Sequence, residues 1–175
     1  MLRSAGLGFG VPSEAIREIV KSWILARGVR THDQGRVILS PPGSGKSYFV
    51  ERHPDFVDID EFLGDGFLRF HTEDWTREQH TEDEERVHYE KCDVYLAAMR
   101  EAGLWVVGSL FWDYLPDAIV IIDEQRHRSY VDRREDLSWK HADKVRSFLL
   151  SLAKRHPEIQ VFSEWDPVAR PTEWS

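Results

Sequence analysis

The stretch that decides the fold is RVILSPPGSGKSYFVERH, which occupies residues 36–53. Its first part, RVILS at residues 36–40, is a short apolar run of the kind that forms a buried strand. The middle part, PPGSGKS at residues 41–47, interrupts that run with proline and glycine, the strongest breakers of regular structure. The last part, YFVERH at residues 48–53, continues as a helix. The stretch therefore predicts a strand, a tight loop and a helix in immediate succession.

Four more apolar runs along the chain have the length of strands. They are FVDID at 56–60, LWVVGSL at 104–110, AIVIID at 118–123 and IQVFS at 159–163. Runs that are continuous rather than alternating are typical of parallel strands covered on both faces. Helical patterns fall between the runs, and another begins after Ser13 and stops near Gly28. We expect an α/β fold with a doubly wound, parallel five-stranded sheet, helices on both faces and an extra N-terminal helix.

The composition sets limits on what the chain can be. Its 175 residues suit one domain, and 23 Lys and Arg against 31 Asp and Glu give a net charge of −8. That balance disfavours a long nucleic-acid track more than it disfavours one anionic substrate. The single cysteine, Cys92, excludes an intrachain disulfide framework and a Cys-rich zinc site, and we expect it to be a small core residue. With no membrane-length apolar run and no signal-peptide core, we expect the cytoplasm, or a host cytoplasm if the gene is viral.

The loop carries the chemistry that phosphate binding requires. Gly43 and Gly45 allow backbone conformations in which successive N–H groups turn inward and form an anion nest before a helix. The match to the phosphate-loop pattern G-x-x-x-x-G-K-[ST] fails at one position, where Ser40 replaces the first glycine. The alternative is an ordinary Gly/Pro turn. The pattern predicts that ATP is held by Pro42, Gly43, Ser44, Gly45, Lys46, Ser47 and Tyr48, with Lys46 on the β- and γ-phosphates and the Ser47 hydroxyl on Mg²⁺.

With this loop, residues 36–165 resemble the small P-loop kinases, a group that includes nucleoside-monophosphate kinases, shikimate- and gluconate-type kinases and polynucleotide kinases. The resemblance implies one kinase domain over residues 1–175, with a helical extension at 1–35, an acceptor-binding arm at 61–90 and a lid at 124–137. An ATPase is the alternative, since Ile119–Glu124 has the form of four apolar residues followed by two acids. Its place late in the chain, before a basic helix, favours the strand that precedes a kinase lid.

The second predicted strand ends in two acids. Residues two apart on a strand share a face, so Asp58 and Asp60 are expected to point into one site. The resemblance implies that Asp58 lies near Mg²⁺, and that Asp60 orients the acceptor hydroxyl or accepts its proton. The alternative is that one of them caps the following helix.

Four arginines within nine residues form the expected lid: Arg126, Arg128, Arg133 and Arg134. Guanidinium groups can neutralise the charge on a transferring phosphoryl group, and lid closure would exclude water. We expect a catalytic role for Arg126, Arg133 or Arg134, with the last two favoured. The alternative is a solvated basic helix paired with nearby acids.

The acceptor is expected in the arm. Arg69 and Arg77 could hold its phosphate, while Phe67, Phe70 or Trp75 could stack on a base. Trp165 follows the last strand, where the resembling kinases bind adenine. Packing without ligand contact is the alternative for each of these residues.

These observations predict an ATP- and Mg²⁺-dependent phosphotransferase whose partners are a nucleotide donor and a small nucleotide-like acceptor. A (deoxy)nucleoside monophosphate is the leading acceptor. A hydroxyl on a nucleic acid, at a 5′ end or on a hydroxylated base, is less favoured, and a shikimate- or gluconate-type metabolite is a further alternative. A nucleotide-binding regulatory module is the competing class. No membrane contact is expected, and the oligomeric state stays open.

Overall fold

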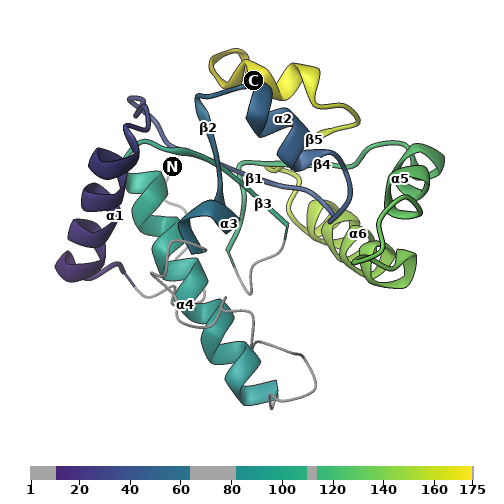
Figure 1. Cartoon of the computed structure of the whole chain (residues 1–175), viewed down its shortest axis with the longest axis horizontal. Helices are drawn as coiled ribbons and strands as arrows, with labels where there is room; N and C mark the ends of the chain where they lie inside the picture. The colour runs from purple at the N-terminus through teal and green to yellow at the C-terminus, as the bar shows by residue number, and fades with distance from the viewer. Residues whose placement is uncertain (1–10, 64–81, 110–113, 175) are drawn as a thin grey trace.

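The computed structural model describes residues 11–63, 82–109 and 114–174, and a single sheet of five strands lies at its centre (Figure 1). The strands are β1 (Arg36–Leu39), β2 (Phe56–Asp58), β3 (Trp105–Gly108), β4 (Ala118–Val120) and β5 (Gln160–Phe162). Their order across the sheet is β2-β3-β1-β4-β5, and every neighbouring pair is parallel. The expectation of an α/β chain with a parallel five-stranded sheet is confirmed.

The helices are α1 (Glu14–Arg27), α2 (Lys46–Arg52), α3 (Ile59–Phe62), α4 (Glu82–Glu101), α5 (Glu124–Val131) and α6 (Trp139–Arg155). Two 3₁₀ turns, η4 (Asp166–Ala169) and η5 (Pro171–Glu173), end the chain. As predicted, the Ser13 hydroxyl caps α1 by accepting a hydrogen bond from the Ile16 N–H, and Gly28 ends it at φ +64°.

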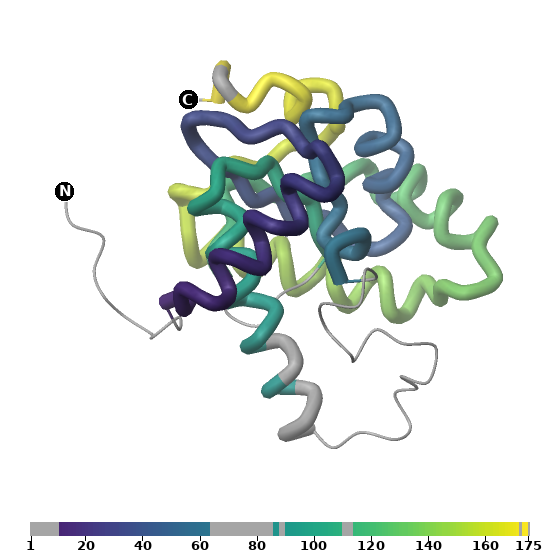
Figure 2. The backbone as a smooth tube through the Cα atoms, turned by 60° about the vertical axis from the view of Figure 1, so that its left-hand side comes forward, coloured from purple at the N-terminus to yellow at the C-terminus, as the bar shows by residue number. Residues whose placement is uncertain are grey.

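Alternate residues along the strands feed two separate cores. On β1, Val37 and Leu39 join a core built with α1, α3, α4 and α6, whereas Ile38 joins a core built with α2 and η4. Side chains alternate across a strand, so this division means that the sheet is covered on both faces. Figure 1 shows α2 and the yellow C-terminal segment on one side of the sheet, with α4 and α6 on the other. The N-terminal helix α1 packs against α4 (Figure 2).

The order of the strands determines where a ligand can bind. From β1 the chain passes through α2 to β2 at one edge of the sheet, and from β4 it passes through α5 and α6 to β5 at the other edge. Beyond the carboxyl ends of β1 and β4, which lie side by side, the chain therefore departs in opposite directions. Such a point leaves a crevice, and ligands of open parallel sheets bind there.

More than one strand ends earlier than predicted: β4, expected over residues 118–123, stops at Val120, and β2 stops at Asp58. The expected strand over residues 56–60 is wrong beyond Asp58, because Ile59 and Asp60 already belong to α3. The cause is local: the Asp58 carboxylate accepts a hydrogen bond from the Asp60 N–H and so caps α3, which competes successfully with continued pairing. Asp58 and Asp60 therefore do not share one face of a strand, contrary to the prediction.

The cysteine behaves as expected. Cys92 on α4 is 2% exposed within the core that α1, α4 and α6 share, and burial raises the pKa of its thiol to about 12. None of the helices in the described ranges combines the length and the apolar character that a membrane crossing requires.

Candidate functional site

The loop between β1 and α2 is closed at its base by two serines. Ser40 is fully buried, and its N–H donates to the Gly108 carbonyl at 2.9 Å, which extends the pairing of β1 with β3. The Ser44 hydroxyl donates to the Ser40 hydroxyl at 2.9 Å. Ser40, which replaces the first glycine of the pattern, therefore forms a side-chain hydrogen bond that links it to Ser44 across the loop.

Both glycines of the loop are required by the backbone. Gly43 has φ +78° and Gly45 has φ +93°, a region that residues with side chains rarely adopt. A Cβ atom on Gly43 would also lie 2.8 Å from Val131 Cγ2 and 2.9 Å from Leu137 Cδ2. The loop therefore packs directly on the end of α5, with no space for a side chain between them.

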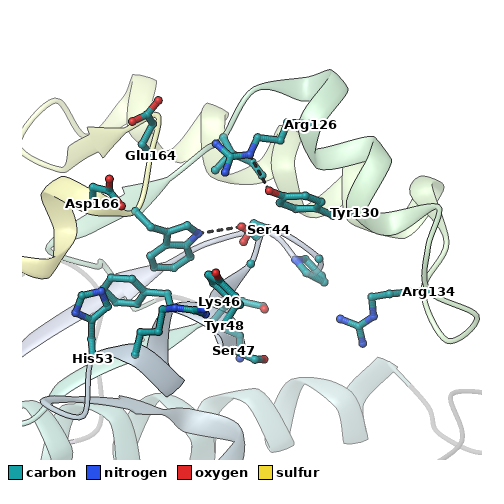
Figure 3. A pocket seen from close by; sticks show the side chains of 18 of the residues that line it. Ser44, Lys46, Ser47, Tyr48, His53, Arg126, Tyr130, Arg134, Glu164 and Asp166 are labelled. Atoms are coloured by element: carbon teal, nitrogen blue, oxygen red, sulfur yellow. Dashed lines mark hydrogen bonds between the residues drawn. The ribbon is translucent and has the colours of Figure 1, made fainter.

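A cavity of about 760 Å³ opens in front of this loop (Figure 3). Residues that follow each of the five strands contribute to it, as expected for a crevice at the carboxyl edge. All seven residues expected to hold ATP line it. The lining residues are Pro42, Gly43, Ser44, Gly45, Lys46, Ser47, Tyr48, Phe49, Arg52, His53, Asp60, Ser109, Ile122, Arg126, Tyr130, Arg134, Glu164, Trp165 and Asp166.

Lys46 joins the two acids. Its Nζ lies 2.6 Å from Asp58 Oδ1, 2.5 Å from Asp58 Oδ2 and 3.0 Å from Asp60 Oδ2. The Lys46 and Asp58 side chains are each 10% exposed, whereas Asp60 is 62% exposed and faces the cavity. The two carboxylates therefore converge on one ammonium group, although by a strand-to-helix turn rather than by a shared strand face.

A second cavity, of about 550 Å³, adjoins the first at Ser47 and Asp60. Asp58 lines it as well, so Ser47 and both acids border this space. Hydroxyl and carboxylate oxygens are ligands that Mg²⁺ accepts, and Mg²⁺ takes only one or two protein ligands when phosphates and water supply the rest. Ser47 and Asp58 therefore fit such an ion. The described residues contain no group of three or more His, Cys, Asp or Glu side chains that could hold a metal by themselves.

The arginines divide into two pairs. Arg126 and Arg134 line the first cavity, where the Arg126 Nε donates to the Tyr130 hydroxyl at 2.8 Å (Figure 3). Arg134 pairs with Asp136 at 2.5 Å. Arg128 instead lies over the Trp139 ring, at 5.7 Å from its centroid. Neither Arg128 nor Arg133 is among the described residues that line the cavity. Of the three arginines expected to have a catalytic role, Arg126 and Arg134 are among the described residues that line the cavity and Arg133 is not.

One residue of the site has a role that the sequence analysis did not assign. His127 on α5 is fully buried, and its Nε2 lies 2.9 Å from the Pro42 carbonyl oxygen of the loop. Burial lowers the pKa of its imidazole, and the nearby Arg146 guanidinium acts in the same direction. A signal exists in the sequence, since His127 and Val131 are four residues apart and form the buried face of a helix that is otherwise highly polar.

Trp165 makes the matching contact from the opposite wall. Its Nε1–H donates to the Ser44 carbonyl at 2.9 Å, and its ring stacks on Phe49 at 4.7 Å between centroids. Trp165 both lines the cavity and packs against Phe49, so it is a packing residue, and its contact with adenine stays a prediction. Nearby, the Arg52 guanidinium lies 3.5 Å over the exposed ring of Tyr48. This wall of the cavity offers aromatic area to a planar ligand.

Asp123 and the residues of the acceptor-binding arm are the remaining residues that the sequence analysis singled out. Asp123, which belongs to the ATPase-like run, caps α5 by accepting from the Arg126 N–H and is not among the described lining residues. The arm residues Phe67, Arg69, Phe70, Trp75 and Arg77 lie outside the described ranges.

Comparison of the chain with models of protein families, with characterised proteins and with solved structures finds no match in any of the three.

Proposed function

We propose that this chain is an ATP- and Mg²⁺-dependent phosphotransferase of the small P-loop kinase type. One observation carries the proposal: the glycine loop, Lys46 and Asp60 meet in one cavity at the carboxyl edge of a parallel sheet, and Asp58 binds Lys46 from the adjoining cavity. Phosphoryl transfer demands positioning and charge neutralisation more than covalent chemistry. A cradle of backbone N–H groups, an ammonium group and a carboxylate beside it supply both.

Lys46 changes partners in this mechanism. Without nucleotide, its ammonium group is held by Asp58 and Asp60. A bound triphosphate offers a stronger concentration of negative charge, so Lys46 turns to the β- and γ-phosphate oxygens. The two carboxylates are released by the same movement. Nucleotide binding therefore prepares Asp58 and Asp60 for their own tasks.

Asp60 then acts on the acceptor. Its carboxylate is the more exposed of the two and borders both cavities, so it can reach a hydroxyl group in either. An Asp60 oxygen accepts the hydrogen bond of that hydroxyl, orients it and takes its proton as the new O–P bond forms. The bond between the γ-phosphorus and the β–γ bridging oxygen breaks in the same step, and ADP leaves. Mg²⁺ held by Ser47 and Asp58 would neutralise charge on the phosphate oxygens.

Arg126 and Arg134 neutralise charge on the transferring phosphoryl group. Both guanidinium groups line the cavity, and a planar fork suits the oxygens of a transferring phosphoryl group. Asp136 and Tyr130 hold the two side chains in place before a ligand arrives. Because Asp123 caps a helix instead of lining the cavity, the geometry favours a kinase over the ATPase alternative.

For the acceptor we retain a nucleotide-like small molecule, with a (deoxy)nucleoside monophosphate as the first candidate. The second cavity favours another candidate, a neutral hydroxyl on a nucleic acid or on a small metabolite. Its polar lining consists of Ser47 and four acids, Glu51, Asp58, Asp60 and Glu61, with no Lys or Arg among the described lining residues. Such a rim repels an acceptor phosphate at close range.

The test is a screen for transfer of the labelled γ-phosphate of ATP, with Mg²⁺, to nucleosides, nucleoside monophosphates, polyols and oligonucleotides. Label in a nucleoside monophosphate supports the first candidate, whereas label confined to nucleosides, polyols or oligonucleotide hydroxyls supports the second. ATP binding by titration calorimetry without product in any acceptor class would contradict both and indicate a regulatory module.

A further inference from the structure

Two carbonyl groups of the phosphate loop are held by side chains from distant parts of the chain. The Pro42 carbonyl accepts a hydrogen bond from His127 Nε2 at 2.9 Å, and the Ser44 carbonyl accepts one from Trp165 Nε1 at 2.9 Å. The dashed line in Figure 3 marks the second contact. Because a carbonyl can only accept, the His127 Nε2 carries the proton.

Each contact fixes the direction of an amide group. In a trans peptide the C=O and the following N–H point in opposite directions, and no described peptide bond is cis. With the Pro42 carbonyl turned to His127, the Gly43 N–H points away from His127. With the Ser44 carbonyl turned to Trp165, the Gly45 N–H points away from the indole. Both N–H groups lack an acceptor among the described residues, so they are available to a ligand.

The positive φ angles of the same two glycines fit this arrangement. Alternation of carbonyls turned outward and N–H groups turned inward is how a short loop forms an anion nest. Nothing within the loop holds the Pro42 and Ser44 carbonyls outward, since the described partners of both are the two ring N–H groups. A rotation of either peptide would replace an N–H donor by a carbonyl oxygen, which repels phosphate.

We propose that His127 and Trp165 are positioning residues that hold the Pro42 and Ser44 carbonyls outward and thereby keep the Gly43 and Gly45 N–H groups directed at a bound phosphate. The proposal rests on the proposed function of the loop. His127 also ties the loop to α5, next to the contact that leaves no space for a Cβ on Gly43. Since Arg126 precedes His127, the same hydrogen bond fixes one arginine relative to the nest.

The first experiment removes one ring N–H while keeping an aromatic ring. Trp165→Phe loses the donor to Ser44 and retains the stacking on Phe49. The matched control is Trp174→Phe, which loses an indole hydrogen bond to the Pro167 carbonyl, away from the loop. The ligand is inorganic tripolyphosphate with Mg²⁺, which has no base to stack on Trp165. By titration calorimetry we expect Trp165→Phe to bind about five- to tenfold more weakly, and Trp174→Phe to bind like the wild-type chain.

The second experiment uses a rescue. His127→Leu removes the donor and keeps an apolar side chain, whereas His127→Gln retains an N–H group at a similar reach. We expect His127→Leu to weaken tripolyphosphate binding by about five- to tenfold and His127→Gln to recover most of the loss. A purely structural role would give both variants the same affinity. Thermal unfolding of each variant verifies that the chain is folded.

The outcomes separate the two proposals. If the wild-type chain binds neither tripolyphosphate nor ATP, the proposed function fails and this inference fails with it. If the wild-type chain binds and all four variants bind equally well, the proposed function stands and the positioning role of His127 and Trp165 is wrong.

Discussion

Lys46 Nζ lies within 2.6 Å of both carboxylate oxygens of Asp58, and the two side chains are each only 10% exposed. A pair so enclosed is costly to break by removing one partner, because the other charge stays behind without compensation. The pair also lies where the loop, α2 and β2 meet, so in the mechanism proposed above its separation would couple nucleotide binding to the acids.

The first prediction concerns stability. Lys46→Met keeps the length of the side chain but leaves Asp58 as a nearly buried carboxylate without its cation, and we expect the free energy of unfolding to fall by about 3 kcal/mol. The double variant Lys46→Met/Asp58→Asn removes both charges and should recover at least half of that loss. Urea unfolding followed by circular dichroism measures both. A single variant as stable as the wild-type chain would show that the pair is not a coupled unit.

The second prediction concerns Asp60. Asp60→Asn keeps the shape of the side chain and removes its ability to accept a proton, so we expect kcat to fall by about 10²–10⁴-fold. The Kd for ATP should change little, because Asp60 is the weaker and more exposed partner of Lys46. Steady-state kinetics with titration calorimetry separates the two quantities. Equal losses in kcat and in ATP affinity would instead make Asp60 a binding residue.

The third prediction distinguishes arginines of one helix. Arg126 lines the cavity, whereas Arg128 lies over Trp139 outside it. We expect Arg126→Ala to lower the transfer rate by about 10–100-fold, since it removes charge opposite the phosphoryl group. Arg128→Ala is the matched control, with a change of less than about twofold. Comparable losses in the two variants would point to general electrostatics of α5 rather than to contact with the phosphates.

The fourth prediction compares two glycines with positive φ. Gly28 ends α1 with open space around it, while a Cβ on Gly43 would meet Val131 and Leu137. Alanine should cost about 1–2 kcal/mol of stability at either position, from backbone strain alone. Gly43→Ala should in addition weaken ATP binding by at least about tenfold, because the loop must move off α5. Unchanged ATP affinity in Gly43→Ala would place the phosphates elsewhere.

The fifth prediction concerns pH. Burial, assisted by Arg146, lowers the pKa of His127 from its ordinary value of 6.5, although the Pro42 hydrogen bond and Asp143 act the other way. As the pH falls, the unfolded chain takes up this proton before the folded chain does. The stability contributed by neutral His127 is therefore complete above pH 6.5 and is lost as the pH falls from there toward the lowered pKa.

The check is a comparison with His127→Gln, whose side chain does not titrate. Between about pH 7.5 and about pH 5, the wild-type chain should lose more of its unfolding free energy than the variant does, by urea titration at each pH. Parallel losses over this range would mean that His127 is not the titrating group.

Much of the fold follows from local spacing in the sequence. The glycine loop, the five strands and the cap of α1 at Ser13 each depend on residues within a few positions of one another. Asp58 shows the limit of this reasoning, because an aspartate at the end of an apolar run fits a strand and a helix cap equally well. The competition between further strand pairing and the start of α3 determines which role Asp58 takes, and in the structure Asp58 caps α3.

The rest of the site depends on contacts between distant residues. His127 meets Pro42 across 85 positions and Trp165 meets Ser44 across 121, distances over which no periodicity carries information. The position of Arg126 at the cavity depends on a shorter separation along the chain. Arg126 and Tyr130 are four residues apart and so share a helix face, and that face lines the cavity. Arg128 lies two residues from each of them and so on another face of α5, whereas Arg133 and Arg134 both follow the end of α5 at Val131, where helical spacing no longer distinguishes them.

The central claim is that Lys46 and its loop transfer the γ-phosphate of ATP to an acceptor. The most direct test is the initial rate of label transfer from γ-labelled ATP, with Mg²⁺, to the best acceptor of the screen, for the wild-type chain and for Lys46→Met. The account predicts transfer by the wild-type chain and a rate at least about 10²-fold lower in the variant, with circular dichroism showing that the variant is folded. Undiminished transfer by Lys46→Met, or none by the wild-type chain to any acceptor, would contradict it.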